Sequence, residues 1–153
     1  MANFNILANL KKAIVEIEQS VYPTLKDVLN TYSSVLKDIQ NQDQLYNKGQ
    51  NSKTISIVPS YAKSTIDYKL KKGQPIDRVT LKDSGKFYDS VIFYANSTSL
   101  IIEANAEYTK FLTSKYGIDI FGVQEMEFEK FYDKYIKKEL DNKITDIINK
   151  NAL

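Results

Sequence analysis

The sequence predicts an α+β fold, in which a small antiparallel β-sheet, a hairpin at about residues 91–105, is flanked by N-terminal helices and a long C-terminal helix. Two observations carry this prediction. Near both ends of the chain apolar residues recur at three- and four-residue steps, whereas around the hairpin they alternate with a period of two. A length of 153 residues suits a single domain with three parts: an N-terminal helical hairpin (1–43), an α+β core with a mobile loop (44–123) and a C-terminal helix (124–150).

Two helices are expected in the N-terminal part. The first covers residues 4–21, and Pro23 is expected to break it. Thr24 and Asp27 then form an approximate capping box for a second amphipathic helix that ends at about residue 42. The two helices make a hairpin or one kinked rod. The polar stretch 41–60 that follows is expected to be a mobile loop with a short strand at 54–58.

The core contains a short basic helix, the hairpin and a second short helix. Ser64 and Asp67 are expected to cap the first helix, which ends at Gly73. Both faces of the hairpin carry apolar residues, so we expect a helix to cover one face and a helix or another subunit to cover the other. The second short helix runs from Tyr108 to about Gly117.

The C-terminal helix, at residues 124–149, has one apolar face and an ordered set of charges. Its first turns carry three acids, at the positive end of the helix dipole. Acid-to-lysine pairs four residues apart are expected to follow along its length. The three acids are Glu125, Glu127 and Glu129, and the pairs are Asp133 with Lys137, Glu139 with Lys143 and Asp146 with Lys150.

The chain contains neither histidine nor cysteine. This inventory excludes a Ser-His-Asp triad, a cysteine nucleophile, Cys/His zinc sites and iron–sulfur ligation. The inventory does not exclude catalysis by carboxylates or lysine. The acids at residues 125–129 are explained by their position at the start of a helix, and Asp77 and Asp83 are explained by roles in turns or caps. The five glycines are isolated and form no phosphate-binding loop. We therefore expect no enzyme, no catalytic residue, no cofactor and no metal.

The least even charge lies between residues 61 and 86, where seven basic and three acidic side chains give a net charge of +4. The basic residues are Lys63, Lys69, Lys71, Lys72, Arg78, Lys82 and Lys86. This basic segment is either a solvated face or a docking surface for an acidic partner or for DNA. Only Arg78 carries a guanidinium, which argues against sequence-specific reading of DNA.

Three motifs in the middle of the chain resemble those of the virion-morphogenesis and tail-completion (neck) proteins of tailed bacteriophages. They cover roughly residues 45–135 by their order and spacing. The motifs are Tyr61-x-x-Ser64-Thr65-x-x-x-Lys69-x-x-x-Gly73, Leu81-Lys82-Asp83-Ser84-Gly85-Lys86-Phe87-Tyr88-Asp89-Ser90 and Tyr116-Gly117-Ile118-Asp119-Ile120-Phe121-Gly122-Val123. Their key residues are expected to be architectural: Tyr61, Leu81, Asp83, Ser84, Gly85, Phe87, Gly117 and Gly122. In particular, Asp83 or Ser84 caps a helical turn, and Gly85 permits a close backbone approach.

The resemblance implies a structural subunit at the head-tail junction or in the upper tail of a virion that is assembled in the cytoplasm of a host bacterium. Its expected partners are further copies of itself in a ring, portal or connector, stopper or tail proteins, and DNA that passes through the ring, but no membrane. We then expect replacement of Lys69, Lys71 and Lys72 by glutamate to block assembly without unfolding the protein. Two alternatives remain open: a DNA-binding accessory protein that uses the basic segment, and a hydrolase that uses acids or lysine.

Overall fold

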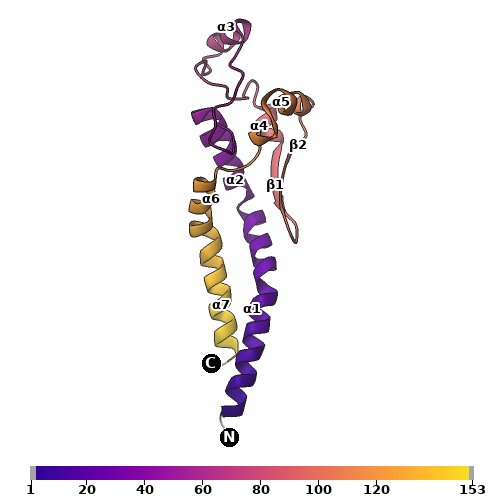
Figure 1. Cartoon of the computed structure of the whole chain (residues 1–153), viewed down its shortest axis with the longest axis vertical. Coiled ribbons are helices and arrows are strands. Elements are labelled where there is room, and N and C mark those ends of the chain that lie inside the picture. Colours follow the sequence, from indigo (N-terminus) through magenta and orange to yellow (C-terminus); the bar gives the residue numbers. More distant parts are fainter. Residues whose placement is uncertain (1–2, 152–153) are drawn as a thin grey trace.

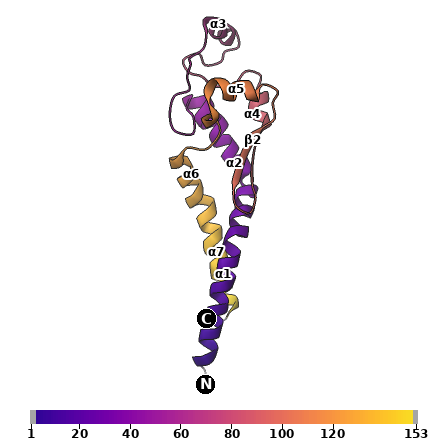
Figure 2. The same cartoon turned by 45° about the vertical axis from the view of Figure 1, so that its right-hand side comes forward.

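The computed structural model describes residues 3–151 and shows an elongated α+β molecule, as predicted (Figure 1). A two-helix stalk carries a head built from short helices, loops and a β-hairpin. In the stalk α1 (Asn3–Thr31) and α7 (Lys137–Lys150) lie side by side and antiparallel, so α1 begins at the end of the molecule where α7 ends (Figures 1 and 2). The first turns of α1 extend beyond the last turn of α7.

The N-terminal part is one kinked rod, which confirms one of the two predicted arrangements. The other, a helical hairpin, is wrong. Helix α1 continues through Pro23, and α2 (Ser33–Asp38) and the π-helical segment η1 (Ile39–Lys48) extend the rod after a break at Tyr32. A proline removes one helical hydrogen bond and strains one turn. Packing against α7 along the neighbouring turns outweighs this local cost, and the antiparallel partner of α1 is the C-terminal helix. The expected capping box at residues 24–27 lies inside α1 and caps nothing.

The predicted C-terminal helix is confirmed as a continuous rod of α6 (Glu125–Phe131), a π-helical segment η3 (Tyr132–Ile136) and α7. Its contact with α1 is apolar near the head, where the rings of Tyr32 and Tyr135 have centroids 4.3 Å apart. At the far end the contact is ionic, with Lys150 Nζ 3.3 Å from a Glu16 carboxylate oxygen.

The ion pairs of this helix differ from those expected. Within residues 3–151, none of the three predicted acid-to-lysine pairs comes within 4 Å, so that expectation is wrong. Lys150 instead reaches across to α1, and Glu127 pairs with Lys130 at 3.2 Å. An exposed lysine gains little free energy from pairing with any one carboxylate. A four-residue spacing therefore does not by itself determine which carboxylate the lysine pairs with.

The hairpin is confirmed, with β1 (Val91–Ala95) antiparallel to β2 (Leu100–Ala104) and Phe93 opposite Ile102. Its position on the rod is fixed by Asn30 of α1, whose side chain accepts a hydrogen bond from Ala95 N at 2.8 Å and donates one to Ala95 O at 3.2 Å. Alternate residues of β1 are buried against α1 and α2. Ile92 and Tyr94 point the other way and are 45% and 39% exposed.

The stretch 41–60, predicted to be a loop, contains more helix and more hydrogen bonds to the rest of the protein than the sequence indicates. Helical structure continues to Lys48 instead of ending near residue 42, and the predicted strand is reduced to one isolated bridge between Gln50 and Ser56. The loop is bonded to distant parts of the head, for example through Ser52 N and Asp119 O at 2.9 Å. Gly49 has φ +60°, and a Cβ there would lie 2.7 Å from Arg78 Cβ.

Buried amide side chains join η1 to the segment that enters α6. Gln44 is fully buried, accepts a hydrogen bond from Gln124 N at 2.7 Å and donates one to Gly122 O at 2.9 Å. Gln40 accepts a hydrogen bond from Gly122 N at 2.7 Å. These side chains form an amide network that satisfies backbone groups which no strand or helix pairs. It holds the head on the rod.

The head contains four further short elements. They are α3 (Lys63–Lys71), α4 (Lys86–Ser90), α5 (Thr109–Tyr116) and a 3₁₀ turn η2 (Ile118–Ile120). Helices α3 and α5 confirm the two predicted short helices. The expected cap of α3 is wrong, because the helix begins after Ala62 with no side-chain cap, and Ser64 lies within it. Gly73 ends the helix at φ +62°, as predicted.

Candidate partner-binding groove

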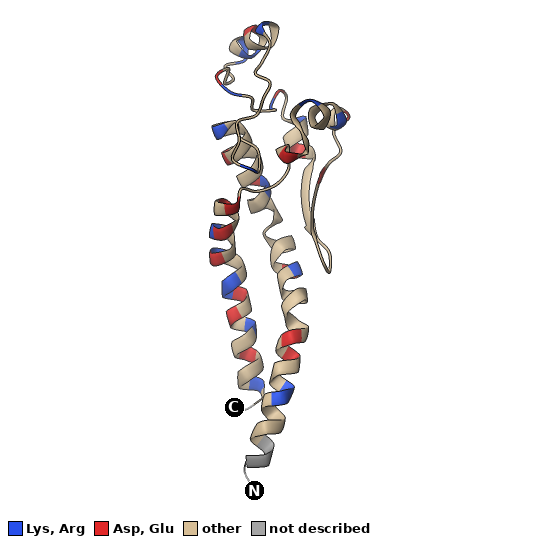
Figure 3. Ribbon diagram, viewed as in Figure 1, with Lys and Arg blue, Asp and Glu red and all other residues tan. Residues whose placement is uncertain are grey.

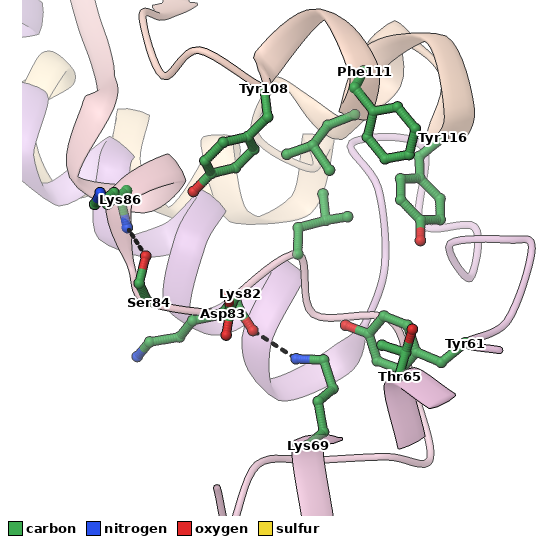
Figure 4. Close-up of a pocket in the computed structure, with 12 residues that line it drawn as sticks. Tyr61, Thr65, Lys69, Lys82, Asp83, Ser84, Lys86, Tyr108, Phe111 and Tyr116 are labelled. Carbon is green, nitrogen blue, oxygen red and sulfur yellow. Dashed lines mark hydrogen bonds between the residues drawn. The ribbon is translucent and has the colours of Figure 1, made fainter. Parts of the chain in front are cut away.

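An open groove of about 600 Å³ lies in the head between α3, the loop 81–86 and α5 (Figure 4). We call it the head groove. Its lining combines aromatic rings, aliphatic side chains and lysines. The lining residues are Tyr61, Thr65, Lys69, Leu81, Lys82, Asp83, Ser84, Lys86, Tyr108, Phe111, Leu112 and Tyr116.

One wall of the head groove is the aromatic face of α5. Tyr108 precedes this helix, and Phe111, Leu112 and Tyr116 follow at helical spacing, so their side chains come from the same side. Phe111 is 61% exposed and Tyr108 is 38% exposed. Exposed aromatic side chains that gather along one wall, unlike a single exposed ring, mark a surface that can bind another molecule.

The floor of the head groove is fixed by hydrogen bonds that converge on Thr80. Its backbone N–H donates to Tyr61 Oη at 2.8 Å, and the Tyr88 hydroxyl donates to its carbonyl oxygen. Burial raises the pKa of Tyr88, which keeps this hydroxyl protonated and able to donate. Leu81 follows with φ +56°, a conformation that the neighbouring contacts hold in place. Leu81 and Phe87 are 8% and 1% exposed, as expected for core anchors of this turn.

Lys69 is part of this framework, and its ammonium is engaged by the protein itself. It is only 4% exposed, and its Nζ donates to Lys82 O at 2.6 Å and to Gln74 Oε1 at 2.9 Å. The ammonium also lies 4.9 Å from the centroid of the Tyr61 ring. This lysine binds α3 to the loop 81–86, so although it lines the head groove, its charge is held within the head and does not point outward as predicted.

Three more basic residues of the segment are engaged within the head. Lys72 pairs with Asp83 at 2.5 Å, and Lys82 lies 4.7 Å from the centroid of the Tyr46 ring. Arg78 donates to Tyr46 O at 2.8 Å and pairs with the neighbouring carboxylate of Asp77 at 2.7 Å. These contacts reduce the charge that the basic segment presents to a partner.

The Lys72–Asp83 pair also shifts the protonation of both groups. The hydrogen bond from Lys72 holds the pKa of Asp83 below its ordinary value, and the same bond raises the pKa of Lys72. Asp83 therefore tethers α3 and does not cap α4.

Lys63, Lys71 and Lys86 are the remaining members of the basic segment. All three are exposed, and in the part of the chain that the structure describes their side chains make no ion pair or hydrogen bond with the protein. We call them the free lysines. Lys86 lines the head groove, and the other two lie on α3, whose ribbon carries the blue of basic residues at the tip of the head in Figure 3. They are the positions at which the segment presents positive charge outward.

The turn before α4 differs from its predicted chemistry. Gly85 is the residue before the helix, with φ +95°, and Ser84 Oγ lies 3.4 Å from Lys86 N, so it provides only a weak cap. A Cβ on Gly85 would meet nothing closer than Asp89 Oδ2 at 3.7 Å. This glycine is required for its backbone conformation and not for a close approach, so that expectation is wrong. The close approach occurs at Gly122, where a Cβ would lie 2.9 Å from Ser52 Cβ, whereas Gly117 has open space and φ +87°.

The chemistry of the head groove favours binding. Asp83 is its one carboxylate, and it is paired with Lys72. The acids at the start of α6 lie outside the groove, and a hydrogen bond from Lys130 holds the pKa of Glu127 below its ordinary value, opposite to the shift of a general acid. Among residues 3–151 no three acidic side chains gather in a way that could hold a metal ion.

Comparison with protein-family models, with curated proteins and with solved structures gives no match to this chain. The resemblance to the phage proteins therefore rests on the three motifs alone. Within the described residues no helix is both long enough and apolar enough to cross a membrane.

The wall formed by α5 is the part of the site that the sequence does not assign. The helix itself is predicted, and its aromatic residues have the spacing of one face. The same spacing is typical of a helix that packs on a core. Only the exposure of Phe111 distinguishes the two interpretations.

Proposed function

We propose that this chain is a non-enzymatic structural subunit of a tailed-phage virion, located at the head-tail junction or in the upper tail. One observation carries the proposal: the three motifs that resemble the neck proteins, although separate in the sequence, all contribute to the lining of the head groove. The first motif supplies Tyr61 and Lys69, the second supplies the loop 81–86, and the third supplies Tyr116. A shared architecture around one binding surface is what a family of assembly proteins requires.

The groove suits a peptide segment that carries apolar or aromatic side chains and an acidic group. Its aromatic wall offers apolar surface, and Lys86 at its edge offers positive charge. The proposed occupant is a segment of a neighbouring virion protein, such as a portal, connector, stopper or tail subunit or the next copy in a ring. Assembly takes place in the cytoplasm of the host bacterium.

The decisive test is virion assembly with variants of the head groove. Phe111→Asp places a charge on the aromatic wall at a position 61% exposed, so we expect the protein to fold but completed particles to be lost. The matched control is Tyr132→Asp, which changes an aromatic side chain of the stalk that is 42% exposed. Equal particle yields for the two variants, or absence of the protein from purified virions by mass spectrometry, would reject the proposal.

The charge test must use the free lysines instead of the set that the sequence suggests. Changing Lys69 to glutamate would bury a negative charge in the framework of the head, so loss of assembly would report misfolding. Replacing Lys63, Lys71 and Lys86 by glutamate reverses only charges that point outward. We expect this triple variant to keep its helical circular dichroism and melting temperature and to lose affinity for the partner.

A further inference from the structure

Helix α1 carries an apolar stripe that nothing else in the described chain covers. Leu7, Ile14, Val15 and Tyr22 are 65%, 54%, 48% and 67% exposed. At 100° per residue these four side chains fall within an arc of about 100°. The arc is rotated away from Ala13, which is 3% exposed and lies on the side of α1 that packs against the C-terminal helix.

Two exposed charges lie within the same stripe. Lys11 stands between Leu7 and Ile14, and Glu18 stands between Val15 and Tyr22. In residues 3–151 neither charge takes part in an ion pair. The nearby ion pair along the helix joins Lys12 and Glu16 instead. The order along the stripe is therefore apolar, cation, apolar, and then apolar, anion, apolar.

This order is complementary to itself when it is read in the opposite direction. An antiparallel second copy, with the two-fold axis between residues 14 and 15, places residue 7 opposite 22, residue 11 opposite 18 and residue 14 opposite 15. Each apolar side chain then meets an apolar side chain, and Lys11 of each copy meets Glu18 of the other. A parallel in-register pairing would instead place Lys11 against Lys11 and Glu18 against Glu18.

We propose that α1 pairs with α1 of a second copy of this chain in an antiparallel, two-fold symmetric contact centred between Ile14 and Val15. The contact spans about 22 Å, or four helical turns. Six side chains of each copy make this contact, fewer than the roughly 20–30 residues a side of a standard interface, so the dimer forms and dissociates with protein concentration. A two-fold contact closes on itself and leaves the head groove of both copies free. The proposal stands on α1 and does not depend on a phage function.

Charge reversal tests the partner. Lys11→Glu and Glu18→Lys each place two pairs of like charges across the contact, so each variant alone is expected to dimerise at least ten times more weakly than wild type in sedimentation velocity. An equimolar mixture of the two variants restores opposite charges at both positions and is expected to dimerise again, as is the double variant K11E/E18K. Lys12→Glu, rotated 100° around the helix, is the matched control and leaves dimerisation unchanged.

Two outcomes overturn the proposal. One is a wild-type protein that stays monomeric up to millimolar concentration, which would leave the stripe to a different partner. The other is a dimer that neither single reversal weakens, which would place the contact elsewhere. Circular dichroism of each variant verifies that the helices are intact, and the exposure of both charged positions makes a folding defect an implausible source of weaker dimerisation.

Disulfide trapping tests the direction of the helices, since the chain has no cysteine of its own. Leu7→Cys and Tyr22→Cys change exposed positions. The antiparallel contact predicts a disulfide dimer when the two variants are mixed and oxidised, and little dimer when either is oxidised alone. Efficient trapping of Leu7→Cys with itself would show a parallel contact and overturn the proposal.

Discussion

Replacing Gln44 by leucine is expected to loosen the head from the rod. Leucine has a similar volume but cannot hydrogen-bond, so the change leaves Gln124 N and Gly122 O without the protein partners that lie at 2.7 Å and 2.9 Å. These two bonds join η1 to the segment that enters α6. The substitution therefore tests whether the amide network holds the two parts of the molecule together.

The size of the effect follows from the burial of the two groups. An unsatisfied buried donor or acceptor costs about 1–3 kcal/mol. The bond to Gln124 is buried, whereas the bond to Gly122 is partly buried, so the second group recovers some hydration. We expect a net loss of about 2–4 kcal/mol, a substantial fraction of the roughly 5–15 kcal/mol typical of a domain. The melting temperature should fall by about 5–15 °C.

Urea unfolding followed by far-ultraviolet circular dichroism measures this change, because the rod is helical on both sides of the network. Gln42→Leu is the matched control, since Gln42 lies on the same π-helical segment but is exposed. It should change the free energy of unfolding by less than about 0.5 kcal/mol. If Gln44→Leu matches Gln42→Leu within that margin, the amide network does not stabilise the fold.

Three further substitutions, one titration and one binding measurement probe other parts of the structure. Lys69→Met should lower the free energy of unfolding by about 1–3 kcal/mol because two partly buried oxygens lose their donor, while Lys71→Met should leave it within about 0.5 kcal/mol in the same urea assay. Pro23→Ala should raise it by about 1–3 kcal/mol, because α1 gains a hydrogen bond and loses a clash; a fall would show that the proline is needed. An NMR titration should give a pKa for the Asp83 carboxyl below its ordinary value of 3.8. Because this pKa is lowered in the folded state, the stability contributed by the Lys72 pair is present above about pH 4. That stability is lost as the pH falls through the pKa of the folded protein. Fluorescence anisotropy at several salt concentrations measures how many basic residues contact DNA phosphates. If only the free lysines do so, a plot of the logarithm of affinity against the logarithm of salt concentration should have a slope no steeper than about −3. A slope near about −6 would mean that the whole basic segment faces DNA.

Local patterns predict the elements whose packing is also local. The alternation of residues 91–104 around a polar turn predicts the hairpin, and the apolar face of residues 124–149 predicts the C-terminal helix. Gly73 and Pro75 likewise predict the end of α3. In each case the neighbours along the chain supply the hydrogen bonds, so the sequence of the segment is sufficient.

Tertiary contacts explain the features that the sequence does not predict. Pro23 disfavours a helix locally, but the C-terminal helix supports α1 along its length. Residues 40–44 are polar and typical of a loop, yet the amide groups of Gln40 and Gln44 are buried because residues 122–124, far away in sequence, need partners. Lys69 resembles its basic neighbours, and only its position beneath the loop 81–86 makes it a structural residue.

The sequence likewise does not predict the two surfaces on which the proposals rest, the exposed stripe of α1 and the head groove. A three- or four-residue recurrence of apolar side chains shows that a helix has an apolar face, but it does not show what covers that face. In α1 the side of Ala13 is covered by the C-terminal helix, while the side of Leu7 and Tyr22 is left open. In α5 the face that includes Phe111 opens onto the head groove. Because these open faces lie at opposite ends of an elongated molecule, one copy can hold a second copy through its stalk while its head engages a different protein.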